Sequence, residues 1–171
     1  MSDIKTKYPA SGSTPITCDI SSLASSTVFA GRASTFVDNT TNCDLDHIIS
    51  GKITLGTTPT VSKQVLVYIY LPLSVTAGVP TWPDGITGTD ANKTLTSVNS
   101  AINMLRAPIW SGSSDAVTGR VLNMPGCSLV WHLGYMPQFY GLFVVHETVA
   151  ALNSTSGNHE FNYQRDQAQS V

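Results

Sequence analysis

Charged side chains are scarce in this sequence. They make up 12% of the 171 residues, and Glu147 and Glu160 are the only glutamates. Typical soluble domains carry about twice that share of charge, and Glu and Lys are the residues that best support the solvent face of a helix. Ser and Thr supply the polar surface instead, and Thr fits a pleated strand well. The composition therefore predicts strands rather than helices.

Runs of positive charge and long apolar stretches are absent as well. The net charge is −2 and no cluster of Lys or Arg occurs, which excludes the electrostatic footprint of a nucleic-acid or anionic-membrane partner. No window approaches the 18 apolar residues of a transmembrane helix. The first ten residues include Asp3, Lys5 and Lys7 with no apolar segment behind them, unlike a secretory signal. We expect a soluble protein made in the cytoplasm.

Paired cysteines are also missing. Cys18, Cys43 and Cys127 are odd in number, far apart and never in a C-x-x-C pair, so neither a disulfide framework nor a zinc site is indicated. We expect all three to be buried and to act as small apolar side chains.

Catalytic motifs do not emerge from the remaining residues. No G-x-S-x-G elbow, no phosphate-binding glycine loop and no H-E-x-x-H pair occurs. Four histidines occur, His47, His132, His146 and His159, and we expect most of them to be strand residues with ordinary hydrogen bonds. The segment 84–90 carries two carboxylates at a length that suits Ca²⁺ but lacks the spacing of an EF-hand, so we expect a solvated loop. The sequence predicts no enzyme and no cofactor.

The chain length fits one domain with an extended arm before it. Residues 1–15 are rich in Ser, Thr and Pro and show no periodicity, which predicts an N-terminal arm. Residues 16–171 are expected to form a single antiparallel β-sandwich of jelly-roll type with about eight strands. The expected strands are Ile16–Ile20, Thr27–Phe36, Asp46–Leu55, Gln64–Leu71, Gly119–Met124, Ser128–Leu133, Phe139–Glu147 and His159–Gln164.

Three further expectations concern the arrangement of these elements. The turn-rich segment 56–62 predicts that Asp46–Leu55 and Gln64–Leu71 pair as antiparallel neighbours. The unbroken apolar run in Gln64–Leu71 predicts a strand covered on both faces. Helical spacing of apolar residues in Ser97–Leu105 predicts one short helix.

The tryptophans leave two interpretations open. Trp131 lies in an apolar run and is expected in the core, whereas Trp82 and Trp110 border prolines in loops and are candidates for exposure. Exposed tryptophans could stack on sugars in a carbohydrate-binding module, or could anchor a subunit interface. We favour the second interpretation.

The residue pattern of several segments resembles that of the tailed-bacteriophage proteins that decorate or cement the capsid. Those proteins are commonly small β-sandwiches. The segments that carry this likeness are 50–60, 64–70, 82–90, 145–153 and 158–163. The resemblance implies a structural virion protein on the capsid surface, synthesised in the host cytoplasm. Its partners would be the major capsid protein and copies of itself, with a trimer suggested by the family and a dimer equally permitted.

Interface residues follow from that resemblance. We expect Tyr8, Pro9 and Pro15 of the arm to contact the capsid or a neighbour, and the aromatic residues Trp82, Trp110 and Phe139 to anchor the contact. The alternatives are a tail- or fibre-associated virion protein and a carbohydrate-binding sandwich module.

Overall fold

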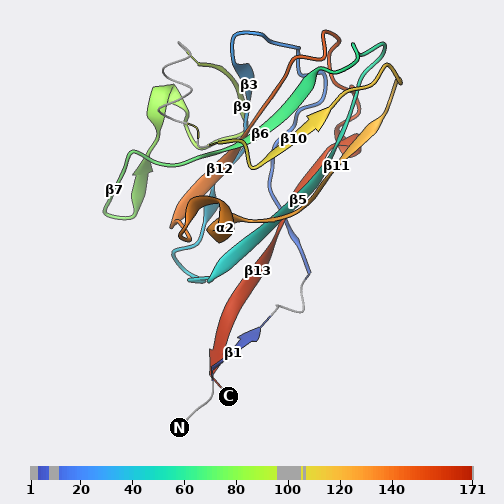
Figure 1. The fold of residues 1–171 in the computed structure, drawn as a ribbon. Coiled ribbons are helices and arrows are strands. Elements are labelled where there is room, and N and C mark those ends of the chain that lie inside the picture. The colour runs from blue at the N-terminus through green and yellow to red at the C-terminus, as the bar shows by residue number, and fades with distance from the viewer. Residues whose placement is uncertain (1–3, 8–11, 96–104, 106, 171) are drawn as a thin grey trace.

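Alternating apolar residues build two antiparallel sheets that pack face to face (Figure 1). The computed structural model describes residues 4–7, 12–95, 105 and 107–170. The first sheet has the order β1-β13-β5-β11, with β2 paired to β13. Its strands are β1 (Ile4–Lys7), β2 (Thr14–Pro15), β5 (Asp46–Thr54), β11 (Val121–Ser128) and β13 (Glu160–Ser170).

The second sheet has the order β10-β6-β12-β3-β9, with β4 paired to β12. Its strands are β3 (Ala30–Ala33), β4 (Val37–Asp38), β6 (Gln64–Tyr70), β9 (Ala91–Thr94), β10 (Trp110–Ser113) and β12 (Phe139–His146). A separate hairpin joins β7 (Ser74–Thr76) to β8 (Val79–Thr81), and short helices occur at η1 (Pro83–Gly85), α2 (Leu129–Leu133) and η2 (Ser156–Asn158). The predicted antiparallel β-sandwich is confirmed. None of the described helices has the length and apolar character needed to cross a membrane.

The main core lies between the two sheets. Ile49 and Ile53 of β5 face Val65, Val67 and Ile69 of β6, and all five are fully buried. Sheets that pack in this way lie about 10 Å apart. Burial of these branched side chains provides the main force that holds the sandwich together.

A second apolar cluster covers the outer face of the β6 and β12 sheet. The alternate residues of β6, Leu66, Tyr68 and Tyr70, pack there with Phe143 and Val145 of β12. Gly141 lies opposite Tyr70 in the ladder and leaves the space that the tyrosine ring fills. The prediction that β6 is covered on both faces is therefore confirmed.

The predicted pairing of Asp46–Leu55 with Gln64–Leu71 is wrong. The strands β5 and β6 form where the sequence predicts them, but they belong to opposite sheets. The link between them is long enough to cross the gap between two packed sheets, and Thr58 and Ser62 turn it with positive φ angles of 49° and 60°. The two apolar faces meet across the core instead of edge to edge.

The segment Ile16–Ile20 is not a strand. Burial alternates as the sequence predicts, with Ile16, Cys18 and Ile20 buried, but no ladder forms. Ile16 N–H donates to the Phe161 carbonyl of the first sheet, and the Thr17 carbonyl accepts from Thr35 N–H beside the second. The segment bridges the two sheets along one side of the sandwich. In Thr27–Phe36 only Ala30–Ala33 is strand.

The predicted strand Ser128–Leu133 is also wrong, because the chain turns into the helix α2 after Ser128. The Ser128 hydroxyl caps this helix by accepting from Trp131 N–H, and Gly134 ends it with a φ of 82°. A Ser cap and a Gly stop are the usual helix boundaries. The predicted helix Ser97–Leu105 lies outside the described residues except for Leu105, which forms a bridge with Tyr70.

Candidate interaction surfaces

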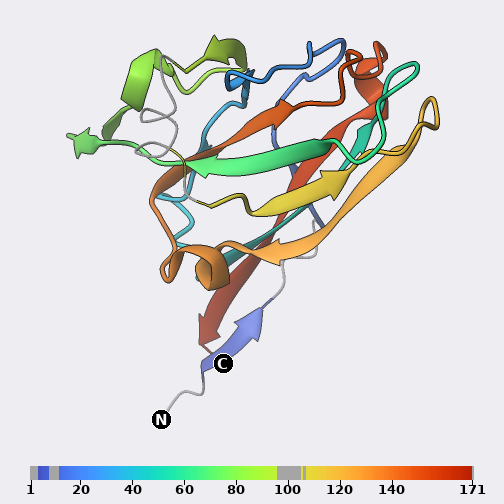
Figure 2. The same ribbon diagram turned by 45° about the horizontal axis from the view of Figure 1, so that its top comes forward.

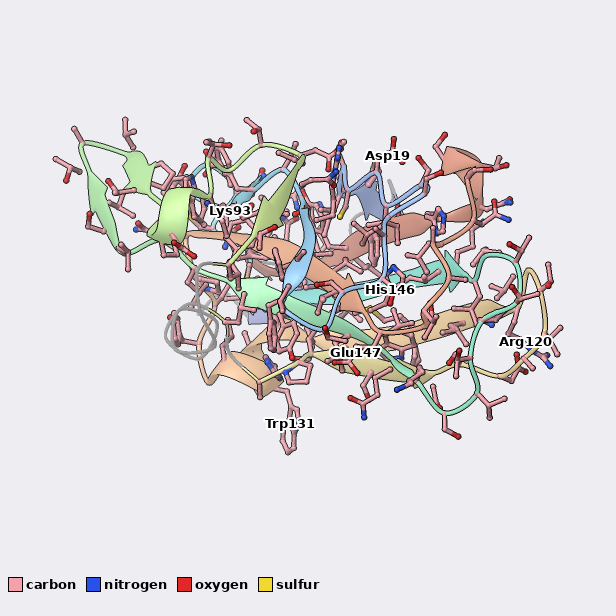
Figure 3. The ribbon with its side chains drawn as sticks, turned by 90° about the horizontal axis from the view of Figure 1, so that it is seen from above. Asp19, Lys93, Arg120, Trp131, His146 and Glu147 are labelled. Atoms are coloured by element: carbon pink, nitrogen blue, oxygen red, sulfur yellow. The ribbon has the colours of Figure 1, made fainter. Side chains whose placement is uncertain are left out.

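The indole ring of Trp131 projects into solvent from α2. Its side chain is 90% exposed, the highest value among the large apolar side chains of the described residues. Figure 3 shows the ring pointing away from the sandwich. Tyr135, just after the helix, is 48% exposed. An exposed residue of this kind marks a binding surface more often than an exposed aliphatic residue does.

The backbone that carries Trp131 is held firmly. Leu129 is fully buried in the main core, and the Asp46 carboxylate accepts from Val130 N–H at 2.9 Å. On the far side, the His132 ring nitrogen Nε2 lies 2.8 Å from the Ala107 carbonyl oxygen. The position of Trp131 is therefore fixed before any partner arrives, which reduces the entropy lost on binding.

The hairpin β7–β8 is a second apolar projection. It extends from one end of the body (Figures 1 and 2), and residues 64–83 contain no charged side chain. Leu73 is 70% exposed and Val79 is 67% exposed. Ala77 and Gly78 form the turn with positive φ angles of 50° and 80°, the conformation that a two-residue hairpin turn requires.

The two chain ends form a third projection. Strand β1 pairs with residues 167–170 of β13, and this two-stranded ribbon extends beyond the body of the sandwich (Figures 1 and 2). Strand β5 stops pairing with β13 at Asp166. Pro15 is exposed in β2 and lies opposite Asn162 of β13. Tyr8 and Pro9 lie outside the described residues.

The aromatic residues expected at an interface lie mostly against the chain itself. Trp82 is half-buried, with its ring 5.1 Å from that of Tyr70 between centroids, and Trp110 packs against the main core. Phe139 is 2% exposed and its ring lies 5.8 Å from that of Phe36. Phe139 therefore offers almost no surface to another molecule.

The expectation that Trp131 lies in the core is wrong. The apolar run around it resembles a strand, but the helix α2 turns Leu129 inward and Trp131 outward. The sequence did contain a signal for this helix. Ser128 is a typical residue at the start of a helix and Gly134 is a typical residue at its end.

No protein-family model matches this chain, and no curated protein matches it either.

A buried polar network joins the first sheet to the second. The Asp44 carboxylate accepts from Arg165 Nε at 2.8 Å and from Gln167 Nε2 at 2.6 Å, and it lies 2.9 Å from His47 Nε2. The other ring nitrogen of His47 is 2.8 Å from the Tyr140 hydroxyl. Because a carboxylate can only accept, Nε2 carries the proton and Nδ1 accepts from Tyr140.

This network follows the order acid, histidine, hydroxyl, but its groups are sealed from solvent. Tyr140 is fully buried and His47 is 1% exposed. Burial raises the pKa of Tyr140 well above its usual value, which opposes formation of a nucleophilic oxyanion. We interpret the network as structural.

The other histidines are also occupied by the fold. His146 is buried, with Nδ1 2.9 Å from the Thr148 hydroxyl and Nε2 2.9 Å from the Leu23 carbonyl oxygen. His146 and the exposed Glu147 line a shallow pocket beside Leu66, and both are labelled in Figure 3. Both ring nitrogens of His146 are therefore engaged with groups of its own chain.

The loop considered for Ca²⁺ uses one of its carboxylates internally. Asp90 accepts from Arg32 Nε at 2.6 Å and from Arg32 Nη2 at 2.8 Å. Within the described part of the chain, no group of three or more His, Cys, Asp or Glu side chains is placed to hold a metal ion.

The three cysteines are unpaired. Cys18 is buried as expected, and burial together with the nearby Asp90 raises the pKa of its thiol. Cys127 is half-buried, but Cys43 is exposed. The prediction that all three are buried is wrong for Cys43, which lies in a turn with a φ of 50°.

Proposed function

We propose that this chain is a structural protein of a bacteriophage particle that binds the outside of the capsid and stabilises it. The observation that carries the proposal is the exposed indole of Trp131 on a rigidly held helix. Complete burial of such a ring against a partner removes enough apolar surface to contribute on the order of 4–6 kcal/mol before the costs of association.

Three separate projections support the proposal further. The Trp131 side chain on α2, the β7–β8 hairpin and the terminal ribbon point away from the body at separate places (Figures 1 and 3). A protein that cements a shell must contact more than one subunit at once, and separate contact points on a stiff sandwich suit that task. The low charge of the chain agrees with the depletion of charged residues at interface cores.

Sedimentation and electron microscopy with undecorated capsids test the proposal. We expect saturable binding at repeated positions over the whole shell, and loss of most of that binding for Trp131→Ala. Val61→Ala, which truncates a side chain that is 56% exposed on a different loop, should bind like the original protein. Absence of binding to the shell would overturn the proposal, and binding at one vertex would indicate a tail component.

A carbohydrate-binding module is the second candidate, because Trp131 and Tyr135 are both available for stacking on a sugar ring. Glycan arrays and tryptophan fluorescence titrations test it. This candidate would be favoured if a glycan binds the original protein but not Trp131→Ala, and if the original protein does not bind capsids.

A further inference from the structure

The described side chains of the terminal ribbon lie outside both apolar clusters. They are those of Lys5 and Lys7 in β1 and of Gln167 and Ala168 in β13. Strand β1 pairs with β13 and with no other strand that the structure describes. A ladder of two strands alone is marginally stable in water, so the pairing of β1 with its own β13 is expected to open readily.

The ladder of the ribbon has a defined register. Ile4 lies opposite Ser170, Thr6 opposite Ala168 and Lys7 opposite Gln167. In this register Lys5 and Lys7 are paired with the uncharged residues Gln169 and Gln167, so the sequence places no like charges opposite one another. Any copy of β13 presents the same four residues with the same backbone groups.

The connection between β1 and β2 has chain length to spare. Lys7 lies opposite Gln167 and Thr14 lies opposite Tyr163, positions about 13 Å apart along β13 at the rise of an antiparallel strand. The seven residue steps from Lys7 to Thr14 can span about 23 Å when extended. The segment can therefore carry β1 to a neighbouring molecule that lies beside its own β13.

We infer that β1 is exchanged between copies, so that residues 4–7 of one molecule pair with residues 167–170 of a second. The occupant of this β13 edge is thus the N-terminal strand of another copy of this chain. Exchange keeps every backbone hydrogen bond of the ladder and adds a link between molecules, which makes it a low-cost route to an oligomer. The inference deepens the proposed function, on which it rests for the expectation that copies meet.

Cysteine cross-linking between two different variants tests the exchange. In a background of Cys43→Ser and Cys127→Ser, one chain carries Thr6→Cys and the other carries Ala168→Cys. Directly opposed residues of an antiparallel pair have Cα separations that suit a disulfide. The two proteins are unfolded together, refolded as a mixture and oxidised. We expect a covalent heterodimer on a non-reducing gel, since neither chain alone holds both cysteines.

Gln164→Cys provides the matched control, because Gln164 is exposed on the same strand but lies opposite Ile48 of β5. Mixed with the Thr6→Cys chain, it should give no heterodimer. Light scattering supplies a second readout: the full chain should be oligomeric, and the chain without residues 1–13 should have the mass of a monomer.

Equal cross-linking of the two mixtures would overturn the exchange. So would a monomeric full-length chain, or a Thr6→Cys/Ala168→Cys double variant that forms its disulfide only within one molecule. These measurements use no capsid, so they can fail while capsid binding succeeds. Conversely, Trp131→Ala should leave the cross-linking yield unchanged even if it abolishes capsid binding.

Discussion

Inside the sandwich, Asp44 is 4% exposed and its carboxylate is surrounded by partners, whereas outside it Trp131 is 90% exposed. Each placement runs against the usual tendency, which buries large apolar residues and exposes charges. The interior compensates the buried charge through Arg165, Gln167 and His47. No comparable compensation surrounds Trp131, so its placement points to a contact outside the chain.

The largest expected effect comes from breaking the interior network. Asp44→Ala leaves Arg165 and His47 without their acceptor and should lower the free energy of unfolding by about 3–5 kcal/mol. Chemical denaturation measures the change. Asp115→Ala is the control, since it removes the exposed partner of Arg120 and should cost less than about 1 kcal/mol. Equal losses for the two variants would contradict a structural role for the Asp44 network.

The next largest effect concerns the second cluster. A methyl group at residue 141 would collide with the Tyr70 ring, so Gly141→Ala should destabilise the protein by about 1–3 kcal/mol. Gly157→Ala is the matched control, because nothing lies within 4 Å of the added atom. Thermal unfolding followed by circular dichroism measures both, and a Gly141→Ala protein that melts with the control would refute the close approach.

Acid should weaken the interior and leave the projections unaffected. Burial lowers the pKa of His47 and His146 from the ordinary 6.5, so the unfolded chain takes up protons before the folded one. Stability is then complete above pH 6.5 and falls as the pH drops below it. Burial alone would raise the pKa of Asp44, but hydrogen bonds from Arg165 and His47 lower it below its ordinary value. Protonation of Asp44 therefore extends the loss of stability to still lower pH.

Denaturant unfolding across this pH range measures the acid effect. His47→Gln should flatten the slope of stability against pH, whereas Trp131→Ala should keep the slope of the original protein. A stability that stays constant from neutral pH to about pH 5 would show that the buried histidines do not exchange protons on unfolding.

The smallest effects on stability should come from the projections. Trp131→Ala removes a side chain that packs little against its own fold, so its free energy of unfolding should change by no more than about 0.5 kcal/mol. Chemical denaturation checks this value alongside capsid binding, which should fall sharply. A loss of stability as large as that of Asp44→Ala would place Trp131 among the structural residues instead.

Removal of residues 1–13 should likewise leave the sandwich folded, because the described side chains of this segment lie outside both apolar clusters. The thermal midpoint should stay close to that of the full chain, while capsid binding weakens. Unchanged capsid binding by the truncated protein would separate the N-terminal arm from the proposed attachment.

The sequence by itself determined the class of the fold and most of its long strands. Apolar alternation and β-branched runs specify β5, β6, β12 and β13, because a period of two residues is a local property that survives whatever the strand pairs with. The scarcity of Glu and Lys also favours strands over helices. These signals require no knowledge of neighbours.

Only the tertiary structure decided which strands pair, which apolar residue is exposed and which charges meet. Strands β5 and β6 are consecutive yet lie in opposite sheets, and Asp44 meets Arg165 across 121 positions of the sequence. Such choices depend on which arrangement buries the most apolar surface at once, and that quantity belongs to the whole chain. Trp131 shows most clearly what local sequence patterns cannot predict. It lies in an apolar run, but Leu129 occupies the core and the short helix between Ser128 and Gly134 turns Trp131 outward.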